Sequence, residues 1–148
     1  MFNITINEVK GNPINIENNN EKIIIAHICN ENTWENEFTK TLSKKWIEPE
    51  IIFKKEKLTI GKVQIININN NITIANMIVE NSSNNIEVEY GAFRLCLNYV
   101  NDKAFRTNST IHIPLPKKYT TTNIKNNILN IIKNVMSVNI TLYNPILT

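Results

Sequence analysis

The residues at 23–28 read IIIAHI and constrain the fold of this chain more than any other stretch. They are apolar apart from His27, and they end in the polar pair Cys29-Asn30. A short apolar run of this kind is typical of a strand that is buried on both faces of a sheet. It therefore predicts a sheet that carries helices on both sides.

The residues after Asn30 predict a loop and then an amphipathic helix. Apolar side chains recur four apart and form one helical face: Trp34, Phe38, Leu42 and Trp46. Thr33 is the predicted N-cap of this helix, and Glu35 and Glu37 fall in its predicted first turn, where carboxylates complement the helix dipole.

The remaining chain alternates strand-like and helix-like segments. Further strands are predicted at 2–6, 63–68, 72–78, 109–116 and 138–143, and further helices at 90–100 and 124–135, with a short irregular or helical segment from Pro49. The turn at 69–71 predicts a hairpin between the strands on either side of it. These elements predict an α/β fold with a mixed six-stranded sheet sandwiched between helices, in a single domain over residues 1–148.

Charge and cysteine content exclude several classes of function. The net charge is only +3 and the basic residues are spread thinly, so a nucleic-acid partner is not expected. The first residues lack a basic region and a long apolar core, and no apolar run approaches the ~18 residues of a membrane span, so a cytoplasmic location is expected. Cys29 and Cys96 are predicted to be buried free thiols without metal-ligand spacing; no metal and no cofactor are expected.

Ligands of such folds bind at the carboxyl ends of the strands. Asn30 and Asn76 each follow apolar residues there, and each amide either contacts a ligand hydroxyl or caps neighbouring backbone. His27 and His112 lie within strands, where a structural role is favoured over a catalytic one, because no Ser or Asp is placed to complete a triad.

Two further features of these loops have alternative interpretations. Trp34 either stacks on a base or ribose or packs in the core through its four-residue spacing to Phe38. Lys117 and Lys118 either offset phosphate charge or are simply solvated.

Several short segments, taken in order, resemble a macro domain of the bacterial type grouped with ADP-ribose-1″-phosphate processing proteins. They are IIIAHICN, FTKTLSKKWIEPE, LTIGKVQII, ITIANMI, YGAFRLCLNYV, STIHIP and VNITLYNP, from Gly11 to about Asn144. The resemblance implies a mixed sheet between helices and a crevice for ADP-ribose or an ADP-ribosylated molecule. It also implies hydrolysis of the 1″-phosphate or of ADP-ribosyl adducts in some members.

The resemblance also assigns roles to individual residues. The family's Gly-Asp contact to adenine falls at Gly11-Asn12, and its distal-ribose asparagine falls at Asn30, which is the predicted catalytic residue. Ligand contacts are expected from Asn12, Asn30, Trp34, Asn76, Met77, Ile78, Glu80, Pro114, Lys117, Lys118 and Tyr119.

Both glycine-rich loops of the family are missing from this chain. The first corresponds to residues 31–37 and the second to residues 114–122, while the glycines are Gly11, Gly61 and Gly91. Glycine permits positive φ and close approach of backbone to a pyrophosphate. The usual binding pose is therefore expected to be weakened or lost.

Two functions follow as hypotheses. One is a macro-domain protein that binds ADP-ribose or a related nucleotide, with weak phosphatase or ADP-ribosyl hydrolase activity. The alternative is a degenerate macro fold that has lost ADP-ribose binding and serves as a protein-interaction module or takes a different ligand.

Overall fold

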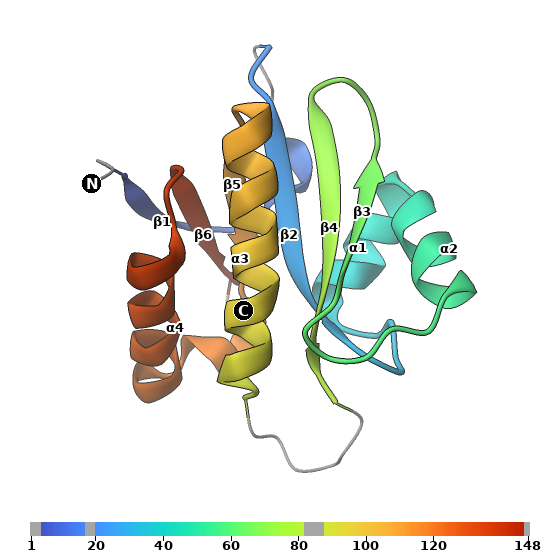
Figure 1. Cartoon of the computed structure of the whole chain (residues 1–148). Coiled ribbons are helices and arrows are strands. Elements are labelled where there is room, and N and C mark those ends of the chain that lie inside the picture. The colour runs from blue at the N-terminus through green and yellow to red at the C-terminus, as the bar shows by residue number, and fades with distance from the viewer. Residues whose placement is uncertain (1–3, 17–19, 82–87, 147–148) are drawn as a thin grey trace.

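A computed structural model describes residues 4–16, 20–81 and 88–146 of the chain (Figure 1). In chain order the elements are β1 (Ile6–Lys10), η1 (Pro13–Asn15), β2 (Ile23–Asn30), α1 (Glu37–Lys45), α2 (Glu48–Lys55), β3 (Val63–Asn67), β4 (Ile72–Glu80), α3 (Tyr90–Thr107), β5 (Thr110–Pro114), η2 (Lys117–Thr120), α4 (Thr122–Val135) and β6 (Ile140–Asn144).

The strands form one six-stranded sheet in the order β1-β6-β5-β2-β4-β3. All neighbouring strands are parallel except β3 and β4, which form the predicted antiparallel hairpin. The apolar strand β2 lies between β5 and β4, and its residues 23–29 are buried. The predicted mixed sheet is confirmed, and the carboxyl ends of five strands meet at one edge.

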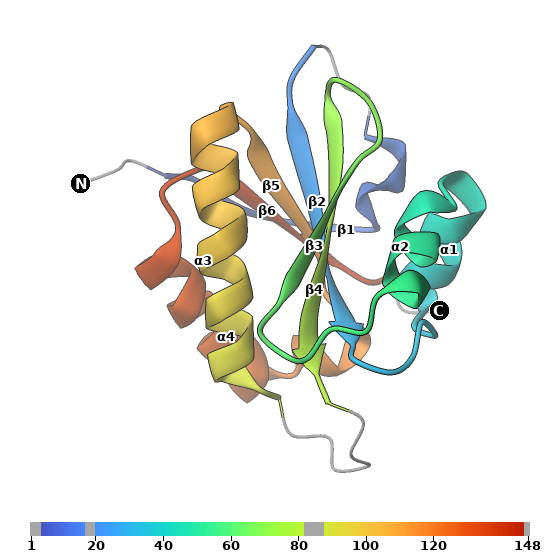
Figure 2. The ribbon, with the colours of Figure 1, turned by 45° about the vertical axis from the view of Figure 1, so that its right-hand side comes forward.

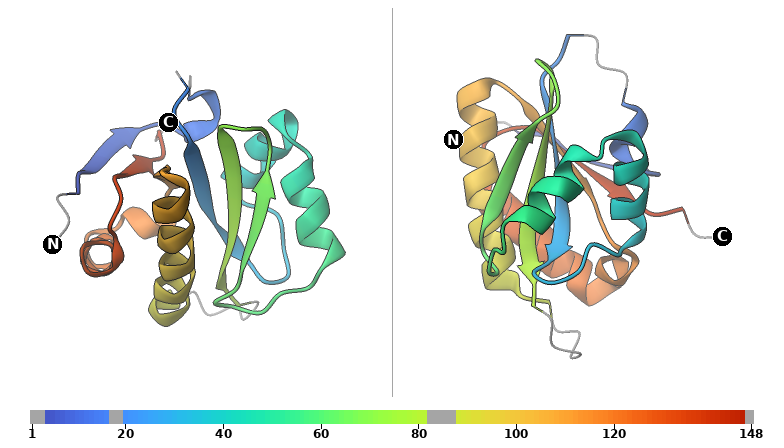
Figure 3. Two further views of the ribbon diagram at one scale, coloured as in Figure 1. Left: turned by 45° about the horizontal axis from the view of Figure 1, so that its top comes forward. Right: turned by 90° about the vertical axis from the view of Figure 1, so that its right-hand side faces the viewer.

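Helices cover the two faces of the sheet separately. Residues that alternate along β2 enter different cores: Ile24 and Ile28 pack with α3 and α4, whereas Ile25 and Cys29 pack with Leu42 of α1. Figure 2 and the right panel of Figure 3 show α3 and α4 on one side of the sheet and η1, α1 and α2 on the other. This period of two explains why a strand with apolar residues at successive positions is buried on both faces.

Several predicted boundaries were wrong; the helix predicted at 90–100, for example, continues to Thr107. The first strand was predicted at 2–6 but runs from Ile6 to Lys10, and Phe2 lies outside the described residues. The strand predicted at 72–78 continues to Glu80, so Asn76 lies in its middle and not at its carboxyl end. The helix predicted from Thr33 begins at Glu37, because Asn36 and not Thr33 supplies the N-cap.

Within the described ranges, no helix has both the length and the apolar character that crossing a membrane requires.

Candidate functional site

A cavity of about 780 Å³ opens at the carboxyl edge of the sheet. Five structural regions contribute its walls: the ends of β1, β2, β4, β5 and β6 with the segments that follow them. The lining residues are Gly11, Asn12, His27, Ile28, Asn36, Glu37, Phe38, Thr41, Glu80, Pro114, Leu115, Pro116, Lys117, Lys118, Tyr143, Pro145 and Ile146. The volume is in the range of sites for small molecules and cofactors.

One end of the cavity is formed where β1 and β6 finish. Gly11 has φ +116° and donates its N–H to the carbonyl oxygen of Asn144 at 2.8 Å. This left-handed turn leads directly into η1, whose N-cap is Asn12; the Asn12 Oδ1 accepts from the Ile14 N–H at 3.0 Å. Tyr143 and Pro145 line the same region. This end of the cavity is therefore formed by an amide, an aromatic ring and apolar surface.

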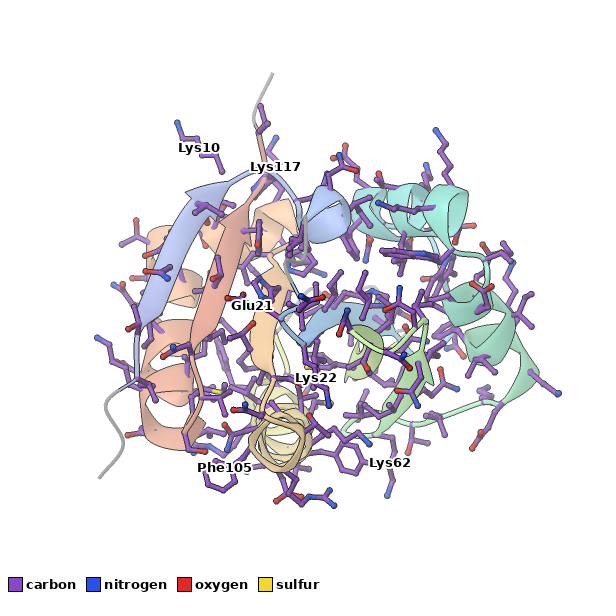
Figure 4. The ribbon with its side chains drawn as sticks, turned by 90° about the horizontal axis from the view of Figure 1, so that it is seen from above. Lys10, Glu21, Lys22, Lys62, Phe105 and Lys117 are labelled. Carbon is purple, nitrogen blue, oxygen red and sulfur yellow. The ribbon has the colours of Figure 1, made fainter. Side chains whose placement is uncertain are left out.

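A smaller cavity of about 390 Å³ adjoins this end and shares Pro145 and Ile146 with the larger one. Lys10 and Lys125 line it, and Lys125 forms an ion pair with Glu8. Figure 4 shows Lys10 and Lys117 projecting on the η1 side of the sheet, opposite Phe105 on the α3 side. Lysine side chains therefore line both cavities.

The buried amide of Asn76 in β4 is hydrogen-bonded to residues of three other elements, β2, α2 and β3. Its Oδ1 lies 2.5 Å from His27 Nε2, and its Nδ2 donates to the carbonyl oxygen of Pro49 and to Gln64 Oε1, each at 3.1 Å. Both N–H groups of this amide and one lone pair of its oxygen are used within the protein. Asn76 is fully buried, so its amide bonds to neighbouring protein groups and is out of reach of a ligand hydroxyl.

His27 and Cys29 are adjacent in space but form no reactive pair. Cys29 Sγ lies 3.6 Å from His27 Nδ1, and both side chains are buried. Burial lowers the pKa of His27 to about 4 and raises the pKa of Cys29, so both groups are neutral near pH 7. A nucleophilic cysteine requires a stabilised thiolate, which this environment disfavours. Burial also raises the pKa of Cys96 to about 12.

The amide of Asn30 is engaged with local backbone. Its Nδ2 donates to the carbonyl oxygen of Asn81 at 3.0 Å, and its Oδ1 accepts from the Asn32 N–H at 2.9 Å. It ties the end of β2 to the end of β4 and starts the turn that follows. Asn30 does not line the cavity, although the resemblance assigns it the distal ribose.

Four other expected ligand contacts lie in the core. Met77 and Tyr119 are fully buried, Ile78 is 1% exposed, and Trp34 is 8% exposed. Trp34 packs edge-on against His27 and its Nε1 donates to Ser43 Oγ at 2.8 Å. Alternate residues of β4 enter the two cores, which explains the burial of both Met77 and Ile78. The expected contacts that do line the cavity are Asn12, Glu80, Pro114, Lys117 and Lys118.

Asn36 is a residue of the site that sequence reasoning missed. Its Oδ1 accepts from the Thr39 N–H at 2.8 Å, and its Nδ2 donates to the carbonyl oxygen of Ile28 at 3.1 Å. One side chain therefore caps α1 and fastens it to β2. The N-terminus of α1 therefore already has an acceptor, the Oδ1 of Asn36, and a carboxylate, that of Glu37 in the first turn.

Asn36 is expected to contribute measurably to stability. Asn36→Ala removes a cap and leaves the Ile28 carbonyl without this donor, so we expect a loss of about 1 to 2 kcal/mol in the free energy of unfolding. Asn36→Asp keeps the cap acceptor and removes only the donor, so about half of that loss is expected. Urea unfolding followed by circular dichroism measures both; equal losses for the two variants would contradict the separate roles.

Neither altered loop contains a residue in the left-handed region. Among the described residues other than glycine, positive φ occurs at Asn20 and Asn108, and neither belongs to a crevice loop. The strain expected from forcing other residues into glycine conformations is therefore absent. The loops instead follow paths that Thr33, Pro116 and their neighbours adopt without strain.

The other end of the cavity is charged. Lys118 Nζ lies 2.6 Å from Glu80 Oε2, and the Tyr119 hydroxyl donates to the same oxygen at 2.8 Å. Glu37 and Lys117 also line the cavity. Glu80 was predicted as a ligand contact, but its pairing with residues 38 and 39 positions later in the chain gives no signal in the sequence.

Thr110, His112 and Tyr143 form a chain of hydrogen-bonded side chains. His112 Nδ1 is 2.9 Å from the Tyr143 hydroxyl, and its Nε2 is 2.9 Å from Thr110 Oγ1. Burial lowers the pKa of His112 to about 4 and raises that of Tyr143, so both are neutral near pH 7. His112 therefore positions an aromatic wall of the cavity, which agrees with the structural role favoured from the sequence.

Comparison with solved structures identifies the fold. A macrodomain protein from Streptomyces coelicolor matches with a TM-score of 0.78 at 22% identity, over 93% of this chain and 97% of that one. The chain has a macrodomain fold. The cavity described above lies at the carboxyl edge of this fold.

Two structures from Bacteroides thetaiotaomicron have a higher sequence identity to this chain than the Streptomyces protein has. Each is 28% identical to the chain; their TM-scores are 0.77 and 0.79, and they cover 94% and 95% of this chain and 99% and 98% of their own. One of them is described as a protein of unknown function. No protein-family model and no curated protein sequence matches the chain.

Proposed function

We propose that this macrodomain binds an ADP-ribosyl nucleotide in the crevice and recognises it without hydrolysing it. The observation that carries the proposal is the cavity of about 780 Å³, with an aromatic and amide end and a charged end, at the carboxyl edge of a macrodomain fold. Such a cavity suits an elongated ligand with a base at one end and a sugar at the other.

The different chemistry of the two ends supports one orientation of the ligand. The adenine lies at the end formed by Asn12, Tyr143 and Pro145, because an amide supplies hydrogen bonds and an aromatic ring supplies a stacking surface. The Oδ1 of Asn12 caps η1 but has a second lone pair for an adenine amino group. The distal sugar then lies at the end formed by Glu80 and Lys118.

Lysine side chains, and not a backbone cradle, hold the diphosphate in this proposal. The N-terminus of α1 is capped by Asn36 and carries Glu37, so it attracts an anion weakly. Lys117 and Lys118 also line the cavity, and among the described residues Lys118 forms an ion pair with Glu80 whereas Lys117 forms none. Attraction between exposed charges is screened by salt, so affinity is expected to fall as ionic strength rises.

The state of Asn30 favours recognition over hydrolysis. The resemblance made Asn30 the catalytic residue, but both groups of its amide are bonded to backbone within the loops after β2 and β4. One N–H and one lone pair of this amide are left unused by the two bonds, but Asn30 does not line the cavity. We therefore expect Asn30→Ala to leave the affinity for ADP-ribose unchanged within about twofold, because the two lost hydrogen bonds are to backbone after β2 and β4 and not to the ligand.

Titration calorimetry with ADP-ribose tests the proposed function. Lys117→Gln is expected to weaken binding about fivefold to tenfold at low salt, because it removes a cation that faces the diphosphate. Lys133→Gln is the matched control: it makes the same change in charge in the last turn of α4, outside the cavity lining, and should leave affinity unchanged.

The absence of heat with ADP-ribose, AMP and ADP-ribose-1″-phosphate at high protein concentration would contradict the proposal. Equal weakening by Lys117→Gln and Lys133→Gln would show that the ligand binds by net charge and not in the crevice.

A further inference from the structure

Glu80 is the charged residue of the crevice whose geometry is most tightly fixed. It is the last residue of β4, its side chain is 20% exposed, and it lines the cavity. Its own carbonyl oxygen accepts from the Glu31 N–H at 2.8 Å, so the backbone at this position is fastened to the end of β2.

Two donors hold one oxygen of the Glu80 carboxylate. Lys118 Nζ at 2.6 Å and the Tyr119 hydroxyl at 2.8 Å both contact Oε2. Tyr119 is fully buried, and burial together with the Glu80 charge raises the pKa of its hydroxyl, which therefore stays a donor. The carboxylate is thus fixed from two directions by η2.

The second oxygen of this carboxylate is open. Within the described residues, Oε1 of Glu80 receives no hydrogen bond. Every fully buried side-chain oxygen or nitrogen of these residues has a hydrogen-bond partner, so Oε1, which has none, is not fully buried. Oε1 is therefore reached by solvent at the cavity. A fixed carboxylate oxygen accepts O–H and N–H groups and repels anions.

From this geometry we propose that Glu80 determines which ADP-ribosyl ligand the crevice takes. It accepts a hydroxyl of the distal sugar and disfavours a ligand whose sugar ends in a 1″-phosphate. The inference rests on the proposed function, because it assumes that the sugar lies at this end of the cavity. Lys118 attracts a terminal phosphate less than a free lysine would, because the carboxylate of Glu80 offsets the charge of its ammonium group.

The test compares ADP-ribose with ADP-ribose-1″-phosphate on the full chain by calorimetry. The wild-type protein is expected to bind ADP-ribose about tenfold more tightly than the phosphate, which corresponds to about 1.4 kcal/mol. In Glu80→Gln the neutral amide oxygen still accepts from the Tyr119 hydroxyl. The amide does not repel phosphate, and it leaves Lys118 without its ion pair. The preference for ADP-ribose should therefore disappear or reverse.

Glu48→Gln is the matched control, because it makes the same change in charge in the first turn of α2, outside the cavity lining. It should leave the ratio of the two affinities unchanged. Lys118→Gln provides a second variant: it retains Glu80 without its ion pair, so the preference for ADP-ribose should increase. A thermal melt confirms that each variant is folded.

The outcomes separate the two proposals. A wild-type protein that binds neither ligand would refute the proposed function and this inference with it. A wild-type protein that binds both ligands equally, or a Glu80→Gln variant that retains the wild-type ratio, would refute the inference alone.

Discussion

Replacing Asn76 with alanine is expected to lower the free energy of unfolding by about 3 to 4 kcal/mol, the largest loss expected for a polar residue of this chain. The substitution leaves three groups without their partner: His27 Nε2, the carbonyl oxygen of Pro49 and Gln64 Oε1. Each unsatisfied buried group costs about 1 to 3 kcal/mol. The side chain is fully buried, so water does not replace the lost amide without opening the core.

Urea unfolding at neutral pH measures this loss. The matched control is Asn98→Ala on the exposed side of α3, which makes the same chemical change and should alter stability by less than about 0.5 kcal/mol. Asn76→Asp keeps the shape and introduces a buried charge beside a neutral histidine, so it should also be strongly destabilising. A loss below about 1 kcal/mol for Asn76→Ala would contradict the role assigned to this amide.

Acidification from pH 8 to pH 5 is expected to destabilise the protein by about 2 kcal/mol through His27 alone. Burial lowers the pKa of His27 from 6.5 to about 4 in the folded state. Above pH 6.5 the imidazole is neutral whether or not the chain is folded, and it contributes no pH dependence. As the pH falls below 6.5 the unfolded chain binds a proton that the folded chain excludes, so stability is lost until the pH reaches about 4.

His112 acts in the same direction, because burial lowers its pKa to about 4 as well. Unfolding free energies of the wild type and of His112→Gln at several pH values separate the two, and the variant should retain about half of the slope. Above pH 5 carboxyl groups of ordinary pKa remain mostly ionised, so the histidines dominate this window. An NMR titration of His27 with a midpoint near 6 would contradict the prediction.

The elements of the fold could be predicted because each depends on a local pattern. The apolar residues at 23–28 and the hairpin around 69–71 identified β2, β3 and β4, and the apolar periods at 90–100 and 124–135 identified α3 and α4. These patterns arise from burial on one or two faces and need no knowledge of distant residues. The start of α1 was missed because Thr33 and Asn36 are both acceptable caps, and only the contact of Asn36 with Ile28 decides between them.

The candidate site was less predictable because its contacts join distant parts of the chain. Lys117 and Lys118 line the cavity, but the ion pair of Lys118 with Glu80 depends on how η2 lies over the end of β4. Asn30 and Asn76 looked alike in sequence, each following apolar residues. The first is half-exposed at a strand end and the second is buried within a strand, and that difference follows from where β4 ends.

The absence of left-handed residues from the loops after β2 and β5 has a consequence for protein engineering. A phosphate cradle cannot be restored by writing glycine back at single positions such as Thr33 or Pro116, because the backbone there does not follow a path that glycine alone permits. Each such change would instead increase the freedom of the unfolded chain and lower stability by about 0.4 to 1 kcal/mol. A phosphate-gripping variant would have to be made by transplanting both loops whole, with the Asn36 fastening rebuilt at the new start of the helix.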